Sequence, residues 1–576
     1  MINVKENEQL SILNHSCAHL MAQAIKHLYP QAHFWVGPVI TEGFYYDIDL
    51  GDASISEADF AKIEKEMKKI SKDGKRIIRE ELTKEQALEM FKDDPYKLDL
   101  IGNMDENEVT ITAYRQGDYV DLCRGPHVES VKQIKYFKLL KASGAYWKGD
   151  SNNKMLQRVY GICFPTEEEL NEHLNLIEEA KKRDHRKLGK ELDLFFLSDY
   201  GPGLPFWLPN GYTLKRTLED FWLDLHKKRG YQTIQTPIFL NRELWETSGH
   251  WDHYQDDMFT FEVPDGTFAI KPMNCPGAIL CYKNGLHSYK DLPLRYSELG
   301  NVHRYEASGA LSGLFRVRGF VQDDAHTFVT ENQIGEEIAA IISIYDAVYS
   351  VFGLDYAIEL STRPEGFIGE VETWNKAEEA LEKACLATGH SFKINPGDGA
   401  FYGPKLDFKL HDSLGRIWQC GTVQLDMQLP GRFDCTYVAE DGTKKTPIMI
   451  HRACFGSLER FIGILIEHYA GAFPLWLAPR QIDIIPVNPA HWEYCEEIRA
   501  ELEKKGFRVE VDNRNEKLGY RMRAAQISKI PVSLVIGDKE VAERSVNVRR
   551  FGKQEQVGMS LTDFVAAMEE ERFLKK

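Results

Sequence analysis

The first 165 residues change repeatedly between two hydrophobic patterns. Helical patches stand between short β-rich runs such as VTITAY and YWKGD, and several glycines mark turns between them. A chain that changes in this way between a period of 3.6 and a period of 2 is typical of a mixed domain. We therefore expect one α+β domain over residues 1–165.

An amphipathic helix is predicted next, over residues 166–190. Leu170, Leu174 and Ile177 lie at helical spacing, acidic residues occupy the first turns, and basic residues gather at the end, which matches the helix dipole. Thr166 is a candidate N-cap. The basic run KKRDHRK fits a solvated helix end or a nucleic-acid contact, and the pattern favours the first. We expect a connecting helix here.

The pattern changes again beyond residue 190. Residues 191–478 are rich in Trp, Phe and Gly and end in FPLWLAPR, where two prolines mark a boundary. Residues 479–576 alternate apolar strands, IDIIPV, FRVEVD, PVSLVIG and VNVRR, with helical patterns. This alternation predicts a small α/β domain with a partly parallel sheet.

Composition restricts the class of protein. The chain has 576 residues, 43% hydrophobic and 28% charged, which is ordinary for globular protein and too long for one core. Its most apolar stretch is interrupted by Glu467, His468 and Pro474, and its amino terminus is charged where a signal peptide is apolar. Ten cysteines without a CxxC pair indicate reduced thiols. We expect several domains, no membrane span and a cytoplasmic location.

The acidic charge is unevenly distributed. A net charge of -17 argues against a protein that binds nucleic acid over its whole surface. Residues 481–576, however, carry 17 acidic and 17 basic residues, so this end is neutral. The carboxyl-terminal domain could therefore accept a polyanion.

The densest charge pattern is FRVRGFVQDDAHTF, at residues 315–328. Its arginines are suited to bind a polyanion, and its two aspartates are suited to bind a cation. Its histidine could be a metal ligand. HRYE and FRVRGF lie on either side of a Gly/Ser-bearing turn, which predicts two antiparallel strands with Arg304 and Arg316 directed at one phosphate chain. Taken alone, such arginines are more often surface ion pairs. With no Walker or GxGxxG loop, side chains would have to hold any nucleotide.

Three motifs in a fixed order favour a nucleotide site over surface ion pairs. HRYEASGALSGLFRVRGFVQDDAH resembles the second signature motif of class II aminoacyl-tRNA synthetases, in the form used by the threonyl-tRNA synthetase family. Upstream, LKRTLEDFWLDLHKKRGYQTIQTPIF is similar to the class II dimerisation motif, although alone it would be read as a helix packed in its own core. Its helix has one apolar face, formed by Leu214, Leu218, Phe221 and Leu225. Downstream, HRACFGSLERFIGILIEHY resembles the third motif, which presents Arg460.

The resemblance covers nearly the whole chain and implies its fold. We expect an α+β multidomain protein whose class II antiparallel sheet is flanked by helices. The implied parts are an α+β editing domain (1–165), a linker helix (166–190), the catalytic domain (191–478) and a carboxyl-terminal α/β anticodon-binding domain (479–576). Many members of the family begin with a further ubiquitin-like domain, which this chain is expected to lack.

The class pattern also implies roles at the nucleotide. Arg304 would contact the α-phosphate, Arg316 and Arg460 the outer phosphates of ATP, Glu306 the adenine edge, and Phe320 would stack on the ring. Positioning and charge neutralisation are what such phosphoryl chemistry requires. Mg²⁺ is expected with ATP.

A metal site follows from the family pattern and not from spacing. The resemblance implies one zinc ion per subunit, held by Cys275, His326 and His451, although a satisfied buried histidine would be the ordinary reading of each. A metal that must be coordinated by the substrate's amino and hydroxyl groups refuses valine, which an apolar pocket separates from threonine by only about a hundredfold. Asp324 would accept the ammonium group, and Gln322 would share its strand face. Asp323 should point away.

Further contacts are implied on one strand and one loop. Gln419, Thr422 and Gln424 resemble residues that meet ATP and the reacting groups, while an alternating half-buried strand is the plain alternative. His250 matches a position near the terminal ribose, where it would assist proton transfer. An exposed loop histidine is the alternative.

A second site is implied in the first domain. Serine has both the amino group and the hydroxyl group that would coordinate the metal. It lacks one methyl group, which changes the binding free energy by only about 1 to 3 kcal/mol, so serine should be misactivated. HSCAH and DLCRGPH look like the paired editing motifs, which hydrolyse seryl-tRNA. Their residues also form a complete tetrahedral zinc set, and this alternative stays open. The editing set comprises His15, His19, Cys123 and His127, with Lys97 and Asp121 as helpers.

The last domain resembles the anticodon-binding domain of several class II enzymes. Glu540 and Arg549 are candidates for reading anticodon bases, although a charged β-hairpin is an equal alternative. The resemblance thus implies a threonine-specific homodimeric ligase with tRNA(Thr), ATP and L-threonine as partners and no membrane.

Two other classes of function would leave different marks on the sequence. A non-catalytic RNA-binding paralogue would be signalled by loss of Arg304 or Arg460, and both are present. A zinc hydrolase built on the amino-terminal histidines would be supported by an HExxH helix, which the sequence lacks.

Overall fold

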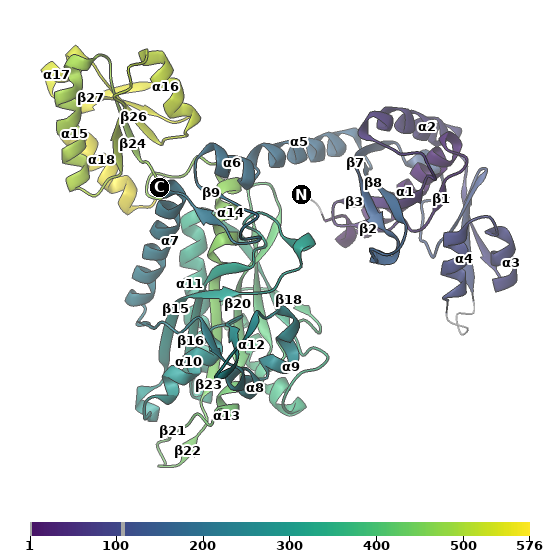
Figure 1. The fold of residues 1–576 in the computed structure, drawn as a ribbon, viewed down its shortest axis with the longest axis horizontal. Coiled ribbons are helices and arrows are strands. Elements are labelled where there is room, and N and C mark those ends of the chain that lie inside the picture. The colour runs from purple at the N-terminus through teal and green to yellow at the C-terminus, as the bar shows by residue number, and fades with distance from the viewer. Residues whose placement is uncertain (1–2, 105–109) are drawn as a thin grey trace. The chain divides into compact units, whose positions relative to one another are not determined.

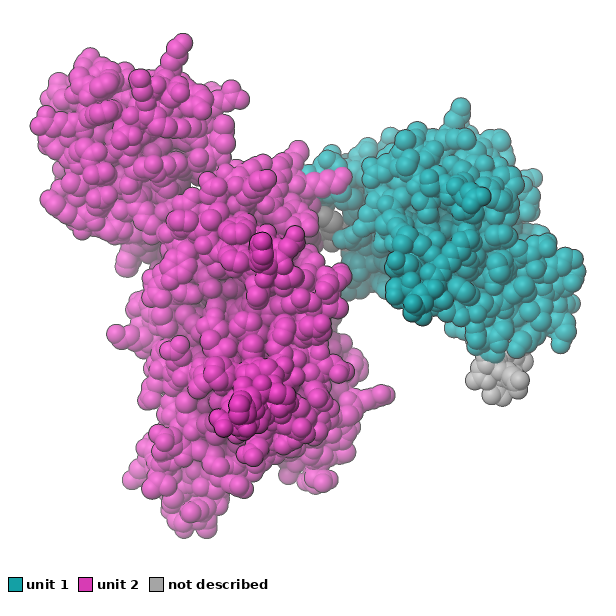
Figure 2. All heavy atoms as spheres, viewed as in Figure 1, with its two compact units in different colours: residues 1–179 teal, residues 180–576 magenta. Residues whose placement is uncertain are grey.

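The computed structural model describes residues 3–104 and 110–576 and divides into two compact units (Figures 1 and 2). Unit 1 comprises residues 1–179 and unit 2 residues 180–576. None of the helices in the described ranges is long and apolar enough to cross a membrane.

Unit 1 is built on a helix laid against an antiparallel sheet. Helix α1 (Glu8–Leu28) starts at Asn7, whose side chain accepts a hydrogen bond from the Leu10 amide at 3.0 Å. Every residue of α1 from Ser16 to Ile25 is buried, and the sheet and α2 (Phe60–Asp73) pack against this helix. The sheet has the order β1-β3-β8-β7, with β2 on β3. Its strands are His33–Phe34 (β1), Val39–Ile40 (β2), Gly43–Asp49 (β3), Tyr136–Tyr146 (β7) and Met155–Phe164 (β8).

A smaller antiparallel sheet completes unit 1. It has the order β4-β5-β6 and carries two short helices on its apolar side. The elements are Ile77–Leu82 (β4), Lys84–Met90 (α3), Pro95–Gly102 (α4), Ile111–Gln116 (β5) and Tyr119–Leu122 (β6). The mixture of helices and short strands predicted for this region is confirmed, but YWKGD is not a strand, because β7 ends at Tyr146 and Trp147–Gly149 form a 3-10 turn before β8.

The connection is two helices rather than one. Helix α5 (Glu167–Arg183) starts at the predicted N-cap Thr166, which exchanges capping bonds with Glu169. Asp184 then breaks the helix because its carboxylate accepts from the Arg186 amide at 2.8 Å and caps a new helix, α6 (His185–Glu191). The single helix expected over 166–190 is therefore wrong in this respect.

An eight-stranded sheet forms the centre of unit 2. Its order is β11-β15-β16-β23-β20-β19-β17-β18, antiparallel except at the two outermost pairs. The strands are Gln232–Thr233 (β11), Leu294–His303 (β15), Gly319–Val329 (β16), Asp355–Ser361 (β17), Phe392–Asn395 (β18), Lys405–His411 (β19), Ile417–Asp426 (β20) and Ile448–Ser457 (β23). The class II antiparallel sheet flanked by helices is confirmed.

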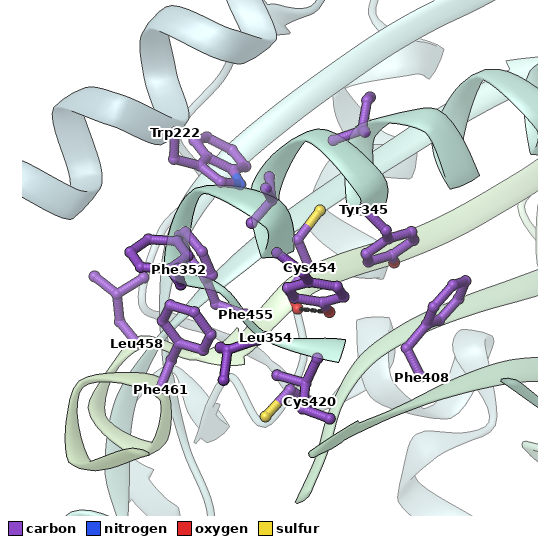
Figure 3. Packing of buried hydrophobic residues seen from close by; sticks show 14 of the residues in the cluster. Trp222, Tyr345, Phe352, Leu354, Phe408, Cys420, Cys454, Phe455, Leu458 and Phe461 are labelled. Carbon is purple, nitrogen blue, oxygen red and sulfur yellow. Dashed lines mark hydrogen bonds between the residues drawn. The ribbon is translucent and has the colours of Figure 1, made fainter. Parts of the chain in front are cut away.

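Long helices bury one face of this sheet. Trp222 of α7 (Pro209–Lys228), Phe352 of α11 (Ile334–Phe352) and Phe461 of α14 (Leu458–His468) meet in one apolar cluster (Figure 3). The predicted apolar face of α7 is present, with Leu214 and Leu218 fully buried. The strand that follows this helix, β11, has only two residues.

The remaining helices and strands around this sheet are mostly shorter. They are Phe195–Phe196 (β9), Phe206–Trp207 (β10), Phe239–Asn241 (β12), Arg242–Ser248 (α8), His250–Tyr254 (α9), Thr260–Val263 (β13), Gly266–Ile270 (β14), Cys275–Lys283 (α10), Val371–Ala387 (α12), Leu429–Arg432 (α13), Tyr437–Val438 (β21) and Lys444–Lys445 (β22).

The carboxyl-terminal part of unit 2 is a five-stranded sheet with helices. The order is β25-β24-β26-β27-β28, parallel over the first three strands and antiparallel after them. This confirms the partly parallel sheet. Its elements are Ile482–Pro486 (β24), Trp492–Lys504 (α15), Val509–Val511 (β25), Leu518–Ile527 (α16), Val532–Ile536 (β26), Asp538–Glu543 (α17), Ser545–Arg550 (β27), Gln556–Ser560 (β28) and Leu561–Phe573 (α18).

Candidate functional site

An open pocket of about 240 Å³ lies over the middle strands of the large sheet. Strands β16, β20 and β23 supply its floor, and the segment between β15 and β16 supplies one wall. The structure brings together here all the residues expected at ATP, namely Arg304, Glu306, Arg316, Phe320, Gln419, Thr422 and Arg460.

The two arginines of the second motif lie in a loop and not on paired strands, which corrects the prediction. Strand β15 ends at His303 and β16 begins at Gly319, so the residues between them form a long irregular connection. The Arg304 amide still donates to the Arg318 carbonyl at 2.9 Å, which holds the base of the loop together. Both side chains nevertheless reach the pocket.

Each pocket arginine is held by a neighbour. Arg316 donates to the Glu306 carboxylate at 2.7 Å, and Arg304 donates to the Pro272 carbonyl at 3.2 Å with its guanidinium 5.4 Å from the ring centre of Phe320. These contacts fix the arginines near one another, where their charges suit an anion.

Arg460 is held from two sides. It lies in the first turn of α14, where the Ser457 hydroxyl caps the helix by accepting from its amide at 3.2 Å. Its guanidinium donates to the Phe315 carbonyl at 3.0 Å and to the Gln419 carbonyl at 3.2 Å. A cation fixed in this way needs little reorganisation to meet an anion.

A β-bulge explains how Gln419 and Thr422 both line the pocket. Residues three apart on a regular strand face opposite sides. The register between β19 and β20 shifts between Phe408 and Lys409, so Cys420 is the extra residue on β20. The bulge turns Gln419 onto the face shared by Thr422 and Gln424.

Cys275, His326 and His451 form a buried cluster able to hold a metal ion. Their ligand atoms all lie within 4.8 Å of one another. His326 and His451 are directly opposite on β16 and β23, and Cys275 begins α10. Burial raises the pKa of the Cys275 thiol and lowers the pKa of His326. His451 Nε2 lies 2.9 Å from the buried Asp426 carboxylate, an outer carboxylate of the kind that orients metal-bound histidines.

Asp323 and Asp324 face opposite sides of the sheet, as strand alternation requires. Asp324 is on the cluster face, where Asn274 donates to it at 3.1 Å and burial raises its pKa to about 6. Asp323 points into the core and accepts from the Trp222 indole at 3.0 Å and from backbone amides of β23. Burial raises the pKa of Asp323 to about 7.

Several buried polar atoms on the cluster side lack a hydrogen-bond partner within the described chain. They are Asn274 Oδ1, Gln322 Oε1 and Thr422 Oγ1. Buried polar groups are normally paired, so their exceptions call for a ligand or water. Gln424, the remaining predicted contact, accepts from the Tyr402 hydroxyl.

His250 is buried rather than exposed on a loop. Its Nδ1 lies 2.8 Å from Ser248 Oγ, and its Nε2 lies 3.8 Å from Cys275 Sγ. Burial lowers the pKa of His250 to about 3. The exposed-loop alternative is wrong, and the structure places this ring beside the metal cluster.

Three site residues escaped sequence reasoning. Asn274 approaches Gly300 so closely that a Cβ on the glycine would lie 2.3 Å from its amide oxygen. Lys405 and Asp407 of β19 line the pocket and form an ion pair at 3.0 Å. Their alternation in KLDFKL was visible as a strand, but only the pairing of β19 with β20 brings them to the pocket.

Unit 1 gathers a second cluster from two distant motifs. His15 and His19 lie one turn apart on α1, and Cys123 and His127 follow β6. Cys123 Sγ lies 3.2 Å from both His15 Nε2 and His127 Nε2. The four ligand atoms lie within 4.8 Å of one another.

Burial keeps this cluster neutral. It raises the pKa of Cys123 to about 12, lowers the pKa of His19 to about 4, and lowers the pKa of His127 further. Neutral imidazoles can accept protons from water or serve as metal ligands. The geometry therefore supports both readings of the cluster.

The two predicted helpers are an ion pair beneath the cluster. Lys97 is only 3% exposed, whereas lysines are usually solvent-facing, and its Nζ lies 2.6 Å from Asp121. Burial alone would raise the pKa of Asp121, but the charges of Lys97 and His19 bring it to about 2. Two partners were missed, because single Ser and Tyr residues give no sequence signal. Ser16 Oγ lies 3.1 Å from His127 Nδ1, and the Tyr46 hydroxyl donates to Asp121.

The carboxyl-terminal candidates have local structural roles. The Glu540 carboxylate accepts from the Gly537 amide at 2.9 Å at the start of α17. Arg549 lies on β27, and the Gln526 amide oxygen, oriented to satisfy both groups, accepts from it at 2.8 Å.

Three segments match known sequence families. Residues 259–469 match the tRNA synthetase class II core domain (G, H, P, S and T), and residues 481–571 match an anticodon binding domain. Residues 111–160 match the threonyl and alanyl tRNA synthetase second additional domain.

Full-length relatives match over nearly the whole chain. The threonine–tRNA ligase of Clostridioides difficile is 52% identical over 99% of this chain and 89% of its own length. That of Fusobacterium nucleatum is 53% identical over 100% of this chain and 93% of its own. A crystal structure described as the RNA binding domain of threonyl-tRNA synthetase from Cryptosporidium parvum is 40% identical, with a TM-score of 0.66 over 68% of this chain and 98% of that one.

Proposed function

This chain belongs to the threonine–tRNA ligase family, and from that premise we propose how its sites divide the work. The enzyme is an aminoacyl-tRNA synthetase that activates threonine with ATP and transfers it to the 3′ end of tRNA(Thr). We assign hydrolytic editing of mischarged seryl-tRNA to the domain that contains the segment related to the threonyl and alanyl second additional domain.

The sheet pocket binds ATP in this proposal. Arg304 meets the α-phosphate, and Arg316 and Arg460 meet the outer phosphates, with Mg²⁺ accompanying them. Three guanidinium groups in one pocket support this assignment, because clustered arginines neutralise the charge that develops during phosphoryl transfer. When ATP binds, the Glu306 carboxylate would leave Arg316 and contact the adenine edge, and Phe320 would stack on the adenine ring.

The remaining strand residues take the reacting groups. Gln419 and Thr422 face the same pocket and would contact ATP. Gln322 and Gln424 would orient the threonine, whose carboxylate attacks the α-phosphate. His250 would assist the later transfer to the tRNA hydroxyl, although its burial requires the acceptor end to reach it.

The buried Cys275, His326 and His451 would hold one zinc ion per subunit. A thiolate and two imidazoles are three ligands, and the position left open suits a substrate. The observation that carries this is the cluster together with the Asp426 carboxylate behind His451. When bound, the metal supplies a Lewis acid that the amino and hydroxyl groups of threonine can share.

Asp324 supplies the matching charge. Its carboxylate lies beside the cluster, 3.8 Å from His326 Nε2, and would accept the substrate ammonium group. Unpaired Asn274 Oδ1 and Thr422 Oγ1 offer further acceptors in the same space. Valine has no hydroxyl to offer the metal, so it would be refused.

Editing is assigned to the cluster of unit 1. His15, His19 and His127 would orient water and the ester, and Cys123 would complete the set. The Asp121 carboxylate lies 3.6 Å from His19 Nε2. Together with its partner Lys97, it would hold the His19 ring in place. We favour a metal-free cluster because its two sequence motifs resemble the paired editing motifs, with a tetrahedral zinc set as the alternative.

The domain bounds follow the same division. The editing domain comprises residues 1–165, the linker 166–190, the catalytic domain 191–478 and the anticodon-binding domain 479–576. In the last of these, Glu540 and Arg549 would contact the anticodon bases. Cytoplasmic location fits the ten free cysteines.

We also propose a homodimer. Several exposed apolar side chains lie in the segment that precedes and enters α7, and exposed apolar surface is typical of a protein interface. Its members are Phe196, Leu197, Tyr200, Phe206 and Tyr212.

Amino-acid-dependent ATP–pyrophosphate exchange tests the whole assignment. We expect strong exchange with threonine, weaker exchange with serine and almost none with valine. His326→Ala should abolish all three because one metal ligand is lost. Exchange that is equal for threonine and valine would contradict the metal-based recognition, and no exchange from folded, zinc-loaded protein would contradict the ATP assignment.

A further inference from the structure

We infer that His185 is a positioning residue for ATP, acting through the turn that carries Arg316. His185 is the first residue of α6, within the run expected to be a solvated helix end, yet it is only 2% exposed. This inference rests on the proposed contact between Arg316 and the outer phosphates.

The two ring nitrogens of His185 have different partners. Nε2 accepts a hydrogen bond from the Leu314 amide at 3.0 Å. Nδ1 therefore carries the proton and donates to the Glu467 carboxylate at 2.7 Å. The ring thus joins the connecting helix, the second motif and the end of α14, three segments far apart in the chain.

The segment that His185 grips is a tight turn. Ser312 and Arg316 pair through their backbones, with the Ser312 amide donating to the Arg316 carbonyl at 3.1 Å and the reverse bond at 3.2 Å. Leu314 and Phe315 form its tip. The tip is held from one side by His185 and from the other by Arg460, which donates to the Phe315 carbonyl at 3.0 Å.

Close packing leaves the turn little freedom. The His185 ring centre lies 4.1 Å from that of Phe315. A Cβ placed on Gly313 would come within 2.1 Å of His185 Nε2, and Gly313 has a φ of +51°. The contact therefore needs both the histidine and a glycine opposite it.

The Glu467 carboxylate anchors the ring in turn. It accepts from the His185 amide at 2.9 Å and forms an ion pair with Arg416 at 2.5 Å. Asp184, His185 and Glu467 also meet the spacing of a metal cluster. Because Leu314 already occupies Nε2 and Glu467 occupies Nδ1, the ring has no nitrogen left for a metal, and we assign a positioning role instead.

The inference predicts different effects for two substitutions. In His185→Gln the side-chain oxygen can still reach the Leu314 amide, whereas in His185→Asn it is too short and can only replace Nδ1. We expect His185→Asn to raise KM for ATP about tenfold in pyrophosphate exchange, with KM for threonine changed less than about twofold. His185→Gln should recover most of the ATP affinity.

A measurement that does not depend on enzyme activity tests the cause of the change in KM. Amide hydrogen exchange over residues 308–318 should accelerate in His185→Asn and stay near the native rate in His185→Gln, because only the second keeps the acceptor for Leu314. Gly313→Ala perturbs the same contact from the turn side and should raise KM for ATP with the connecting helix untouched. This variant keeps the inference testable should His185→Asn fold poorly.

His173→Asn is the matched control. His173 is also a buried histidine of the connecting helices, 4% exposed, but it packs on Phe164 in unit 1. It should leave both KM values within about twofold of native. An equal shift of both KM values, or a fall in kcat alone, in His185→Asn and Gly313→Ala would overturn the positioning role.

Arg316→Ala separates this inference from the proposed function. If Arg316→Ala leaves KM for ATP unchanged, the proposed phosphate contact is wrong. If Arg316→Ala raises KM for ATP while His185→Asn and Gly313→Ala do not, only the role of His185 is overturned.

Discussion

The two clusters of histidine and cysteine contain the same residue types in different surroundings. In unit 2 the ligands are at most 5% exposed, two of them sit opposite each other on paired strands, and a carboxylate stands behind His451. In unit 1 the members bond mainly to one another, and His15, Cys123 and His127 are only partly buried. A deeply buried three-ligand set suits a metal that recognises a small substrate, and a more exposed set suits hydrolysis of a large one.

Metal removal should separate the clusters most strongly. Stripping the full chain with a chelator is expected to lower threonine-dependent exchange about a thousandfold or more, while seryl-tRNA hydrolysis changes less than about twofold. Both assays are run on the same stripped sample, and added zinc should restore exchange. Hydrolysis that falls with the metal would assign a metal to unit 1 as well.

Breaking the unit 1 cluster should have the opposite selectivity. His127→Ala is expected to slow seryl-tRNA hydrolysis about a hundredfold, because a group that holds the attacking water is lost. Exchange should remain native. His27→Ala, on the same helix α1 but outside the cluster, serves as the control. Native hydrolysis in His127→Ala would remove this residue from the proposed site.

Acid should destabilise unit 1 through its buried histidines. The folded pKa of His19 is about 4, against an ordinary 6.5, so between these values only the unfolded chain binds the proton. The free energy of unfolding should therefore fall as pH drops from 6.5 to 4, by about 3 kcal/mol from this group.

Urea unfolding of the full chain at several pH values measures this effect, with hydrogen exchange assigning the transition to unit 1. His19→Gln should flatten the dependence between pH 4 and pH 6.5. An equal slope in the native chain and the variant would show that other groups control the acid response.

The smallest expected effect tests the carboxylate behind the unit 2 cluster. Asp426→Asn should weaken metal binding about tenfold, because the amide orients His451 less strongly than a charge does. Competition with a chromophoric chelator measures the affinity. Asp323→Asn, on the opposite face of the sheet, is the control for stability, and equal metal affinity in both variants would deny Asp426 its role.

The sequence predicted elements better than their junctions. Amphipathic periodicity placed α7, and the cap at Thr166 placed the start of α5, because both signals are local. The break at Asp184 was missed because the basic run resembled an ordinary helix end. The loop bearing Arg304 and Arg316 was read as strand, since strand pattern alone does not show where pairing stops.

The candidate sites divide in the same way. Motif resemblance brought the pocket arginines and the two clusters together correctly, although no spacing linked Cys275 to His451. Residues without a motif, such as Ser16, Tyr46 and Asn274, depended on contacts between distant segments. One signal was available: the odd interval between Gln419 and Thr422 requires a bulge if both face one ligand.

The position of β23 has a consequence for synthesis on the ribosome. This strand is the last of the large sheet to be made, yet it lies between β16 and β20 and contributes to the pocket and the metal cluster. Until residue 457 has emerged, the sheet consists of two separate parts with open edges, which are exposed to wrong pairing. A chain that ends before residue 457 therefore lacks part of the activating site, although the whole of unit 1 has already been synthesised by then.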